Sequence, residues 1–283
     1  MKIVPFKIPK STNETFRVQI DKIPYLYNHL HQHPEIQLTL IKESEGTLIA
    51  GDYVGRFKEK DVFVVGSDQP HVFRNDDKYF KKKFRAFAIS IFFDDSTLGS
   101  FFWQLPEARD VLSFFRNSST GFKITGKKQI QIAEHLEKLV TTKGLDKLIL
   151  FLEIIKLLST KKEMIPLSAP YSRKTIKTFD GNRLNEILEF TFKESHRSIK
   201  LEEIAKIANL TPEAFCKYFK TRTRKTYISF LNEIRISNAC KLFMNEDLQV
   251  SSVCYEVGFN NLSNFNRIFK KVTGKAPKEY VKT

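Results

Sequence analysis

The last hundred residues of the chain contain one sequence pattern twice. Residues 204–231 read IAKIANLTPEAFCKYFKTRTRKTYISFL, and residues 253–280 read VCYEVGFNNLSNFNRIFKKVTGKAPKEY. From Thr211 onward the two copies align at an offset of fifty, whereas before it the offset is forty-nine. The aligned positions are Phe215 and Phe265, Lys217 and Arg267, Phe219 and Phe269, Lys220 and Lys270, and Thr223 and Thr273. This region must therefore fold into two similar units, the second with one more residue in its turn.

Each copy predicts a short helix, a tight turn and a second, amphipathic helix. In the first copy the apolar stripe ends at Asn209, a residue type that tolerates the left-handed conformation of a turn. Thr211 and Pro212 follow as a helix cap and a first helical residue. In the second copy Gly258 replaces Asn209 and Asn261 replaces the capping threonine. This order is typical of a helix-turn-helix, whose second helix enters the major groove.

An alternative is that the two hairpins only pack against each other in an all-α domain. The charge of the region argues against this. Residues 181–283 contain 18 Lys and Arg against 11 Asp and Glu, a net charge of +7 out of +15 for the chain. Basic surfaces bind nucleic acid by releasing counterions from its phosphates. An anionic membrane would also attract them, but the sequence contains no strongly apolar helix or lipid-anchor motif. We expect double-stranded DNA as the partner, and no membrane.

Residues 182–281 resemble the double helix-turn-helix domain of the AraC/XylS family of bacterial transcription regulators. Residues 257–280, VGFNNLSNFNRIFKKVTGKAPKEY, match the family's most specific signature, G-F-x-[DN]-x-S-x-F-x-R-x-F-K-K-x-x-G-x-x-P-x-x-Y. The segments LEEIAKIANLTPEAFCKYFK and RISNACKLF match the first copy and the bridge between the copies. One departure is Arg224, where the family usually has Gly. The first recognition helix is therefore expected to end less firmly than the second.

The resemblance implies two recognition helices joined by a long helix at about residues 227–243. The two helices would be held about 34 Å apart, so that both reach successive major grooves on one face of DNA. The residues expected to contact DNA are Glu213, Cys216, Lys217 and Lys220 in the first copy, and Leu262, Ser263, Asn266, Arg267, Lys270 and Lys271 in the second.

These residues are expected to play two different roles. Arg267 suits a bidentate contact with guanine, Asn266 suits adenine or a phosphate, and Leu262 suits a thymine methyl group. The residues expected to position phosphates without reading sequence are Lys220, Arg222, Lys270 and Lys271. For each lysine the alternative is an ordinary solvated surface charge.

Residues 1–104 contain short β-branched or aromatic runs separated by Gly, Asp and Ser, which predict strands. The runs are IQLTLIKES, GTLIAGDYVGRF, DVFVVGS and FRAFAISIFF. Several such strands predict a small barrel or jelly roll. The segments HQHPEIQ and GSDQPHVFRN resemble the metal-binding pattern of the cupins, H-x-H-x3-E followed by H-x3-N.

Gln37 stands where that pattern has its metal-binding Glu, together with His31, His33 and His71. Glu35 comes two residues early and is expected on the other face of a strand. A neutral amide is a poorer ligand for a divalent ion than a carboxylate. We therefore expect no metal and no other cofactor, and we interpret the three histidines and Gln37 as binding a small organic effector, such as a sugar. The alternative is that they are structural hydrogen-bonding groups in a closed barrel.

Residues 106–159 predict helices, and the last of them, LDKLILFLEIIKLL, is apolar on more than one side. We expect a homodimer through this segment; the alternative is that it only caps the N-terminal domain. Prolines, charges and hydroxyls in residues 160–179 predict a linker. The expected fold class is α+β: a cupin-like β-barrel or jelly roll with a helical hairpin, then an all-α double helix-turn-helix domain. The expected boundaries are 1–105 for the effector-sensing barrel, 106–159 for the dimerisation segment, 160–179 for the linker and 180–283 for the DNA-binding domain.

Composition indicates the compartment. No run of about 18 apolar residues and no charged leader followed by an apolar stretch is visible, so we expect a cytoplasmic protein. The only cysteines are Cys216, Cys240 and Cys254, and their spacing matches no zinc site. Reduced thiols in a cytoplasmic protein are the favoured interpretation.

Two functional classes remain. The favoured class is a ligand-responsive transcription regulator without catalytic residues, and the family resemblance favours an activator that works with RNA polymerase. The other is a cupin oxygenase or isomerase fused to a DNA-binding domain, against which the missing carboxylate argues. A DNA-repair protein with an alkyl-accepting cysteine is a third possibility, which fails because residues 1–215 contain no cysteine.

Overall fold

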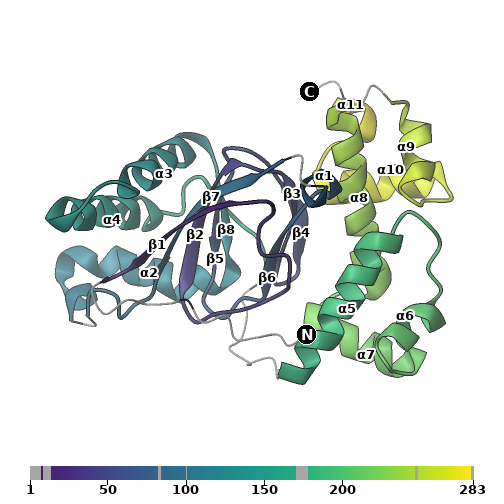
Figure 1. Ribbon diagram of the computed structural model, residues 1–283, viewed down its shortest axis with the longest axis horizontal. Coiled ribbons are helices and arrows are strands. Elements are labelled where there is room, and N and C mark those ends of the chain that lie inside the picture. The colour runs from purple at the N-terminus through teal and green to yellow at the C-terminus, as the bar shows by residue number, and fades with distance from the viewer. Residues whose placement is uncertain are drawn as a thin grey trace. The chain divides into compact units, whose positions relative to one another are not determined.

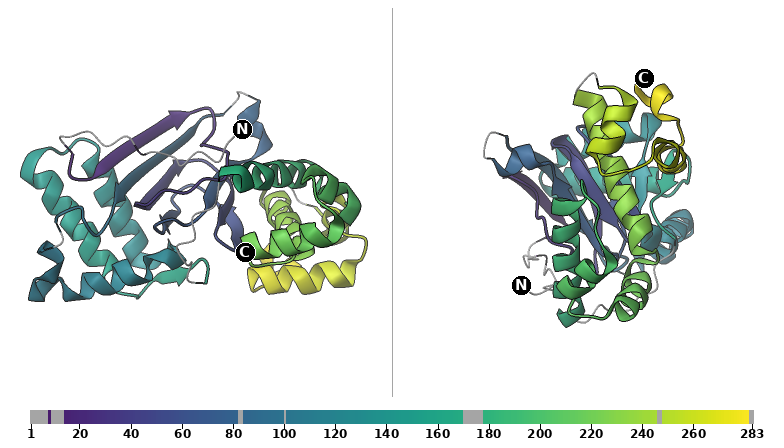
Figure 2. Two further views of the ribbon diagram at one scale, coloured as in Figure 1. Left: turned by 90° about the horizontal axis from the view of Figure 1, so that it is seen from below. Right: turned by 90° about the vertical axis from the view of Figure 1, so that its right-hand side faces the viewer.

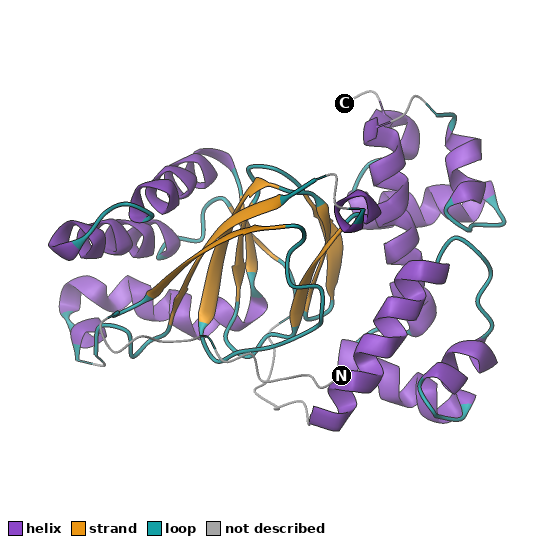
Figure 3. Cartoon of the chain, viewed as in Figure 1, coloured by secondary structure: helices purple, strands orange, loops and turns teal. Residues whose placement is uncertain are grey.

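The computed structural model describes residue 8 and residues 14–81, 84–99, 101–169, 178–245 and 248–281. Residues 170–177 of the predicted linker lie outside this set. The chain forms two compact units, one built mainly of residues 3–176 and the other mainly of residues 177–283. The described strands lie between residues 17 and 166, whereas the described residues from 178 onward contain helices (Figure 3). The α+β fold class is therefore confirmed.

The first unit contains two β-sheets. A six-stranded sheet has the order β1-β7-β2-β5-β8-β9, and every neighbouring pair in it is antiparallel. A three-stranded sheet has the order β4-β3-β6. The strands are β1 (Arg17–Ile23), β2 (Ile36–Glu43), β3 (Gly46–Ala50), β4 (Tyr53–Phe57), β5 (Val62–Val65), β6 (His71–Asn75), β7 (Ala86–Phe93), β8 (Phe122–Ile124) and β9 (Met164–Pro166).

Alternation along the strands separates the two faces of the larger sheet. On β2, Leu38 and Leu40 face a core that also contains residues of three helices, whereas Ile41 belongs to a core shared with the smaller sheet. The helices are α2 (Arg109–Asn117), α3 (Gly126–Leu139) and α4 (Gly144–Leu158), which lie together on one side of the strands (Figures 1 and 2). The described strands thus form two separate sheets with one helical layer, and not the single closed barrel that was one of the two expectations.

Two short strands lie where the sequence indicated none. β8 follows α2 within the segment predicted as helical, and β9 lies within the stretch predicted as linker. Each has three residues, and their pairing joins Lys123 to Ile165. A three-residue strand has too little periodicity to be recognised, because its pairing depends on residues some forty positions away. The helices expected in residues 106–159 are otherwise present.

Helix α4 is apolar on two sides, as its sequence indicated. Phe151 and Ile155 are buried in the core beneath the sheet. Leu145 and Ile149 lie one turn apart and are 70% and 45% exposed, so they remain outside that core. Helix α4 thus covers the sheet and still presents apolar side chains to solvent.

The second unit is organised around one long helix, α8 (Tyr227–Asn245) (Figure 1). Near its start, Tyr227 and Phe230 contact Phe219 of the first copy through edge-on rings with centroids 5.4 Å apart. Near its end, Phe243 meets Phe269 of the second copy at 5.7 Å. The other helices are α5 (Thr178–Glu194), α6 (Leu201–Ile207), α7 (Pro212–Thr223), α9 (Val250–Glu256), α10 (Leu262–Thr273) and α11 (Pro277–Val281). None of the helices in the described part of the chain combines the length and apolarity of a membrane span.

The middle of α8 is tied to the segment that follows α5. Arg235, only 9% exposed, donates from Nε to the carbonyl oxygen of Ser195 (2.8 Å) and from Nη2 to that of Arg197 (2.7 Å). Its guanidinium also lies 5.6 Å from the ring centre of Phe259, in the turn of the second copy. Hydrogen bonds from a charged group to buried carbonyls are strong, so this side chain fixes three segments together.

Candidate functional site

Both copies form the predicted helix-turn-helix. In the first, α6 leads through Asn209, whose φ of +52° is left-handed, to α7. The Thr211 side chain caps α7 by accepting a hydrogen bond from the Ala214 amide at 3.3 Å. In the second, Asn261 caps α10 by accepting one from the Asn264 amide at 2.9 Å. The capping residues predicted from sequence are confirmed.

The turn of the second copy requires glycine for two reasons. Gly258 has φ of +94°, a conformation that side chains disfavour. A Cβ at this position would also lie 2.5 Å from the carbonyl oxygen of Ser195, which is the acceptor of Arg235. The turn therefore approaches the backbone that follows α5 as closely as a glycine allows.

The recognition helices end differently. Arg224 closes α7 with φ of +60°, and Gly274 closes α10 with φ of +78°. Both amides bond the carbonyl four residues earlier at 2.9 Å. A left-handed arginine costs about 1 kcal/mol more than a left-handed glycine. The departure from the family pattern thus places a strained residue at the end of the first recognition helix.

The predicted DNA-contacting residues lie on matched faces of α7 and α10. Opposite the buried phenylalanines, α7 exposes Glu213, Lys217 and Lys220, with Cys216 beside them. At the equivalent positions α10 exposes Ser263, Arg267 and Lys270, with Asn266 and Lys271 beside them. Leu262 differs, because it is half-buried against the apolar cluster of the second copy and offers only part of its side chain to a groove.

The exposed cations are available for an anionic partner. Within the described residues, the ammonium groups of Lys217, Lys220, Lys270 and Lys271 form no ion pair. Arg267 donates from Nη2 to the side-chain oxygen of Asn264 at 2.8 Å, three residues earlier on the same helix. This bond orients the guanidinium along the outer face of α10 and leaves its other donors unused by that contact.

The three histidines of the N-terminal unit come together, as their sequence spacing indicated. His31 bridges to His71 through two backbone hydrogen bonds of 3.0 and 2.8 Å, which brings the residue 31–33 segment beside the start of β6. One ring nitrogen of each of His31, His33 and His71 lies within 4.8 Å of the others, and all three residues are buried. Gln37, at the start of β2, joins the cluster through its side chain, which contacts the rings of His33 and His71.

The hydrogen bonds define the tautomer of each ring. The Nδ1 atoms of His31, His33 and His71 lie 2.9, 2.9 and 2.8 Å from backbone carbonyl oxygens. A carbonyl only accepts, so each Nδ1 carries a proton, and a neutral ring then has a lone pair at Nε2. Burial lowers the pKa of His31 to about 4, and burial also lowers the pKa values of the other two. The rings are therefore neutral at pH 7.

Gln37 faces two of these lone pairs. Its Oε1 lies 3.1 Å from Nε2 of His33 and 3.2 Å from Nε2 of His71, while its Nε2 lies 2.8 Å from the hydroxyl of Thr39. The Gln37 oxygen and the two Nε2 atoms are all hydrogen-bond acceptors, so no hydrogen bond can form among them in this orientation. Rotating the amide by 180° lets its NH₂ donate to both rings and its oxygen accept from Thr39. A cation or a donor between the rings would instead hold the oxygen where it is.

Thr39 belongs to the same group of polar side chains, and its sequence did not mark it as a candidate site residue. Its hydroxyl lies 2.8 Å from that of Ser90, its register partner on β7. The available signal was the spacing, because Thr39 is two residues after Gln37 and so lies on the same face of β2. Asn75, part of the cupin-like motif, lies elsewhere: its Oδ1 accepts from the amide of Leu26 at 2.7 Å.

The cluster borders a small cavity of about 50 Å³ whose lining includes Tyr27, His31, Gln37, Thr39 and His71. Ligand pockets usually exceed about 300 Å³, so this one admits a single small group without rearrangement. As a donor set, three neutral imidazoles and an amide oxygen fit Zn²⁺ or a similar transition metal better than Mg²⁺ or Ca²⁺. The carboxylate of Glu35 is not part of the set, because its Oε2 lies 3.8 Å from Nδ1 of His33, on the outer edge of the ring.

Comparison with known proteins concerns mainly the second unit. A family model described as a helix-turn-helix domain matches residues 204–283. An uncharacterized helix-turn-helix-type transcriptional regulator of Bacillus subtilis, YdeC, is 31% identical over 102 residues, which are 36% of this chain and 35% of that protein. The Msm operon regulatory protein of Streptococcus mutans is 25% identical over 140 residues, 49% of each chain.

The C-terminal part of the chain thus matches a helix-turn-helix domain of transcriptional regulators. A solved AraC-type regulator from Chromobacterium violaceum is 15% identical, with a TM-score of 0.34 over 36% of this chain and 90% of that one. The chain spans only about a third to a half of the lengths of these two curated relatives. The names of both relatives describe regulators.

Proposed function

We propose that the protein is a sequence-specific transcription regulator that reads double-stranded DNA with α7 and α10. The main support is the equivalence of their outer faces: Lys217 and Arg267 occupy the same position in two capped helices attached to one long helix. A domain that only packed its hairpins would have no need of matching cationic faces. Phosphate contacts then provide affinity, and base contacts from Arg267 and its neighbours provide specificity.

Selection of bound sequences from a random DNA pool, followed by footprinting, tests this function. The expected result is one bipartite site with two protected major-groove segments, about 10 base pairs apart, on one face of the duplex. Substituting Arg267 should blur preference in only one of the two segments. Protection of a single segment, or binding without any sequence preference, would refute the proposal.

We further propose that His31, His33, Gln37 and His71 bind the effector. Support comes from their burial and from their convergence: ring nitrogens of the three histidines lie within 4.8 Å of one another, and the Gln37 side chain contacts two of the rings. The small cavity means that a sugar would have to displace the side chains around it, whereas a single polar group of a ligand fits. Binding changes DNA affinity only if the effector prefers one of two arrangements of the protein.

A divalent transition metal is a second candidate for this site, in a regulatory or structural role. The observation in its favour is that all three Nδ1 atoms are anchored on carbonyls, which is how histidine ligands of metals are usually oriented. Metal analysis of protein purified without chelator separates the candidates. Stoichiometric zinc, iron or manganese that His71→Gln removes would favour the metal. Metal-free protein that binds a carbohydrate or other organic compound, and loses it in the same variant, would favour the organic effector.

We also propose that the protein is a cytoplasmic homodimer and an activator that acts with RNA polymerase. For the dimer, the support is the exposed stripe of Leu145, Ile149 and the half-buried Leu152 on α4, which a second copy of the chain would cover. Analytical ultracentrifugation of Leu145→Glu with Ile149→Glu tests it: the variant should be monomeric at concentrations where the unmodified protein is dimeric. Activation is tested by transcription in vitro with purified polymerase.

A further inference from the structure

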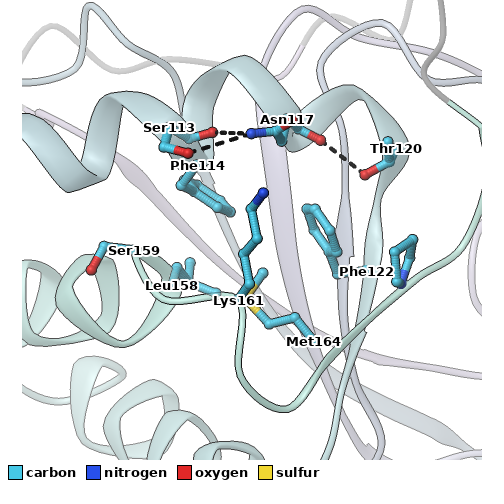
Figure 4. A pocket seen from close by; sticks show the side chains of 10 residues that line it. Ser113, Phe114, Asn117, Thr120, Phe122, Leu158, Ser159, Lys161 and Met164 are labelled. Atoms are coloured by element: carbon cyan, nitrogen blue, oxygen red, sulfur yellow. Dashed lines mark hydrogen bonds between the residues drawn. The ribbon is translucent and has the colours of Figure 1, made fainter.

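A second cavity lies in the N-terminal unit, away from the histidine cluster. It measures about 180 Å³ and is formed between α2, the β8–β9 pair and the end of α4 (Figure 4). Its apolar wall consists of Phe114, Phe122, Leu158, Met164 and Pro166. An engineered cavity of about 150 Å³ in another protein holds benzene, so this volume accommodates a ring or a short alkyl chain.

One charged side chain lines this cavity. In Figure 4 the Lys161 side chain extends between Phe114 and Phe122, with its ammonium directed toward Asn117. Among the described residues, the Lys161 ammonium has no ion-pair partner, and no Asp or Glu is among the lining residues. The other polar lining groups are neutral and already engaged in part: the Asn117 amide donates to the Ser113 carbonyl oxygen at 2.6 Å, and the Thr120 hydroxyl donates to the Asn117 carbonyl oxygen at 2.9 Å.

We propose that this cavity binds a small amphipathic carboxylate, with its apolar part against Phe114 and Phe122 and its carboxylate on Lys161. An ammonium next to an apolar cavity without an anion provides charge complementarity for one ligand class, an organic acid. The aromatic walls add a preference for a ring, because offset or edge-on ring contacts are favourable beyond their buried area. A carboxylate near the cavity mouth keeps contact with water, which limits its desolvation cost.

The test uses the full chain and two probes with the same phenylpropyl skeleton, one anionic and one neutral. Isothermal titration calorimetry with 3-phenylpropanoate should show saturable binding of one molecule per chain. The corresponding alcohol, 3-phenylpropan-1-ol, should bind at least about fivefold more weakly, because it lacks the ion pair and its charge-assisted hydrogen bond. Equal affinities of acid and alcohol, or no saturable binding of either, would overturn the proposal, and Lys161 would then only cover apolar surface.

A matched pair of variants locates the charge. Lys161→Met keeps the length of the side chain and should weaken the acid at least about fivefold while leaving the alcohol unchanged. Lys162→Met removes a neighbouring exposed charge that does not line the cavity, and should change neither. A similar loss in both variants would mean that the acid responds only to the general charge of the surface, which contradicts the proposed site.

Hydrogen exchange provides a second readout that does not depend on affinity. Saturation with the acid should slow amide exchange in peptides covering residues 113–124 and 157–168, which contain the lining residues and the β8–β9 pair. Slowing confined to other peptides would show that the acid binds elsewhere. Lys161→Met should abolish the effect at the same acid concentration.

Discussion

The pair Gly258 and Gly274 allows backbone strain to be separated from close packing. Both glycines have left-handed φ values, +94° and +78°, so alanine is strained by a similar amount at either position. After subtraction of the stability that alanine gains by reducing the entropy of the unfolded chain, the remaining penalty is about 1 kcal/mol. At Gly274 a Cβ would meet no atom within 4 Å, and that penalty is the whole expected loss. At Gly258 a Cβ would lie 2.5 Å from the Ser195 carbonyl oxygen and 2.8 Å from the His196 carbonyl.

The backbone at residues 195–196 must therefore move when Gly258 becomes alanine. Forcing a methyl group into a packed site costs about 1–3 kcal/mol. The Ser195 oxygen is also the acceptor of Arg235, so its displacement weakens a charge-assisted hydrogen bond in addition. We expect Gly258→Ala to lower the free energy of unfolding by about 3 kcal/mol, against about 1 kcal/mol for Gly274→Ala.

Urea unfolding followed by circular dichroism at 222 nm measures both losses. The chain provides its own control, because its single tryptophan, Trp103, is buried in the N-terminal unit. Where the units unfold separately, the Trp103 fluorescence transition should not shift in either variant. Equal losses for Gly258→Ala and Gly274→Ala would refute the reasoning, since the close approach to Ser195 would then have no energetic consequence.

Four further outcomes are expected. Arg267→Ala should weaken specific DNA binding by about 1–3 kcal/mol and relax preference at one base pair, as measured by competition with single-base variants of the selected site. Lys270→Ala should weaken binding to all sequences and reduce the slope of log affinity against log salt by about 1. Arg235→Met should lower the free energy of unfolding by about 2–3 kcal/mol in urea titrations, because two buried carbonyls lose their donor. Because the pKa of His31 falls from 6.5 in the unfolded chain to about 4 in the folded one, the unfolded chain binds this proton first. In urea titrations monitored by Trp103 fluorescence, His31 alone should therefore lower the free energy of unfolding by about 1.4 kcal/mol per pH unit from pH 6.5 down to about pH 4, and His33 and His71 should add to this decline.

Each outcome has a control. A uniform loss across all sequences would contradict base reading by Arg267, and an unchanged salt slope would contradict phosphate contact by Lys270. Arg222→Met removes a half-buried arginine near the end of α7, whose guanidinium lies 6.0 Å from the ring centre of Tyr218, and should cost less stability than Arg235→Met. His31→Gln should reduce the steepness of this decline by about 1.4 kcal/mol per pH unit and leave the part due to His33 and His71. A decline of unaltered steepness in that variant would show that His31 does not contribute to it.

The helix-turn-helix units were predictable because their determinants are local. The turn residues Asn209 and Gly258 and the caps Thr211 and Asn261 lie within a few positions of the elements they terminate, so the sequence pattern contains most of the information. The half-burial of Leu262 was not predictable, because it depends on the whole apolar cluster of the second copy, which a helical projection of α10 alone does not contain.

The N-terminal unit was predictable in its parts but not in its assembly. His31, His33 and Gln37 have the spacing of one motif, and their meeting with His71 followed from that resemblance. The cavity at Lys161 could not be anticipated, because its walls come from α2, β8, β9 and α4, and β8 and β9 are too short to recognise. Likewise, nothing in the residues around Gln37 indicates a cavity of only about 50 Å³.

The attachment of both recognition helices to α8, with Arg235 fastening its middle, has a consequence for the operators that this domain would tolerate. A stiff connection does not stretch when one base pair is inserted between the two contacted segments, and each inserted pair turns the distal segment by about 35° around the duplex axis. Promoters recognised in this way should keep a constant distance between their two half-elements even where the bases between them vary freely. The length of the spacer between the half-elements, rather than its base sequence, would then be the property that selection preserves.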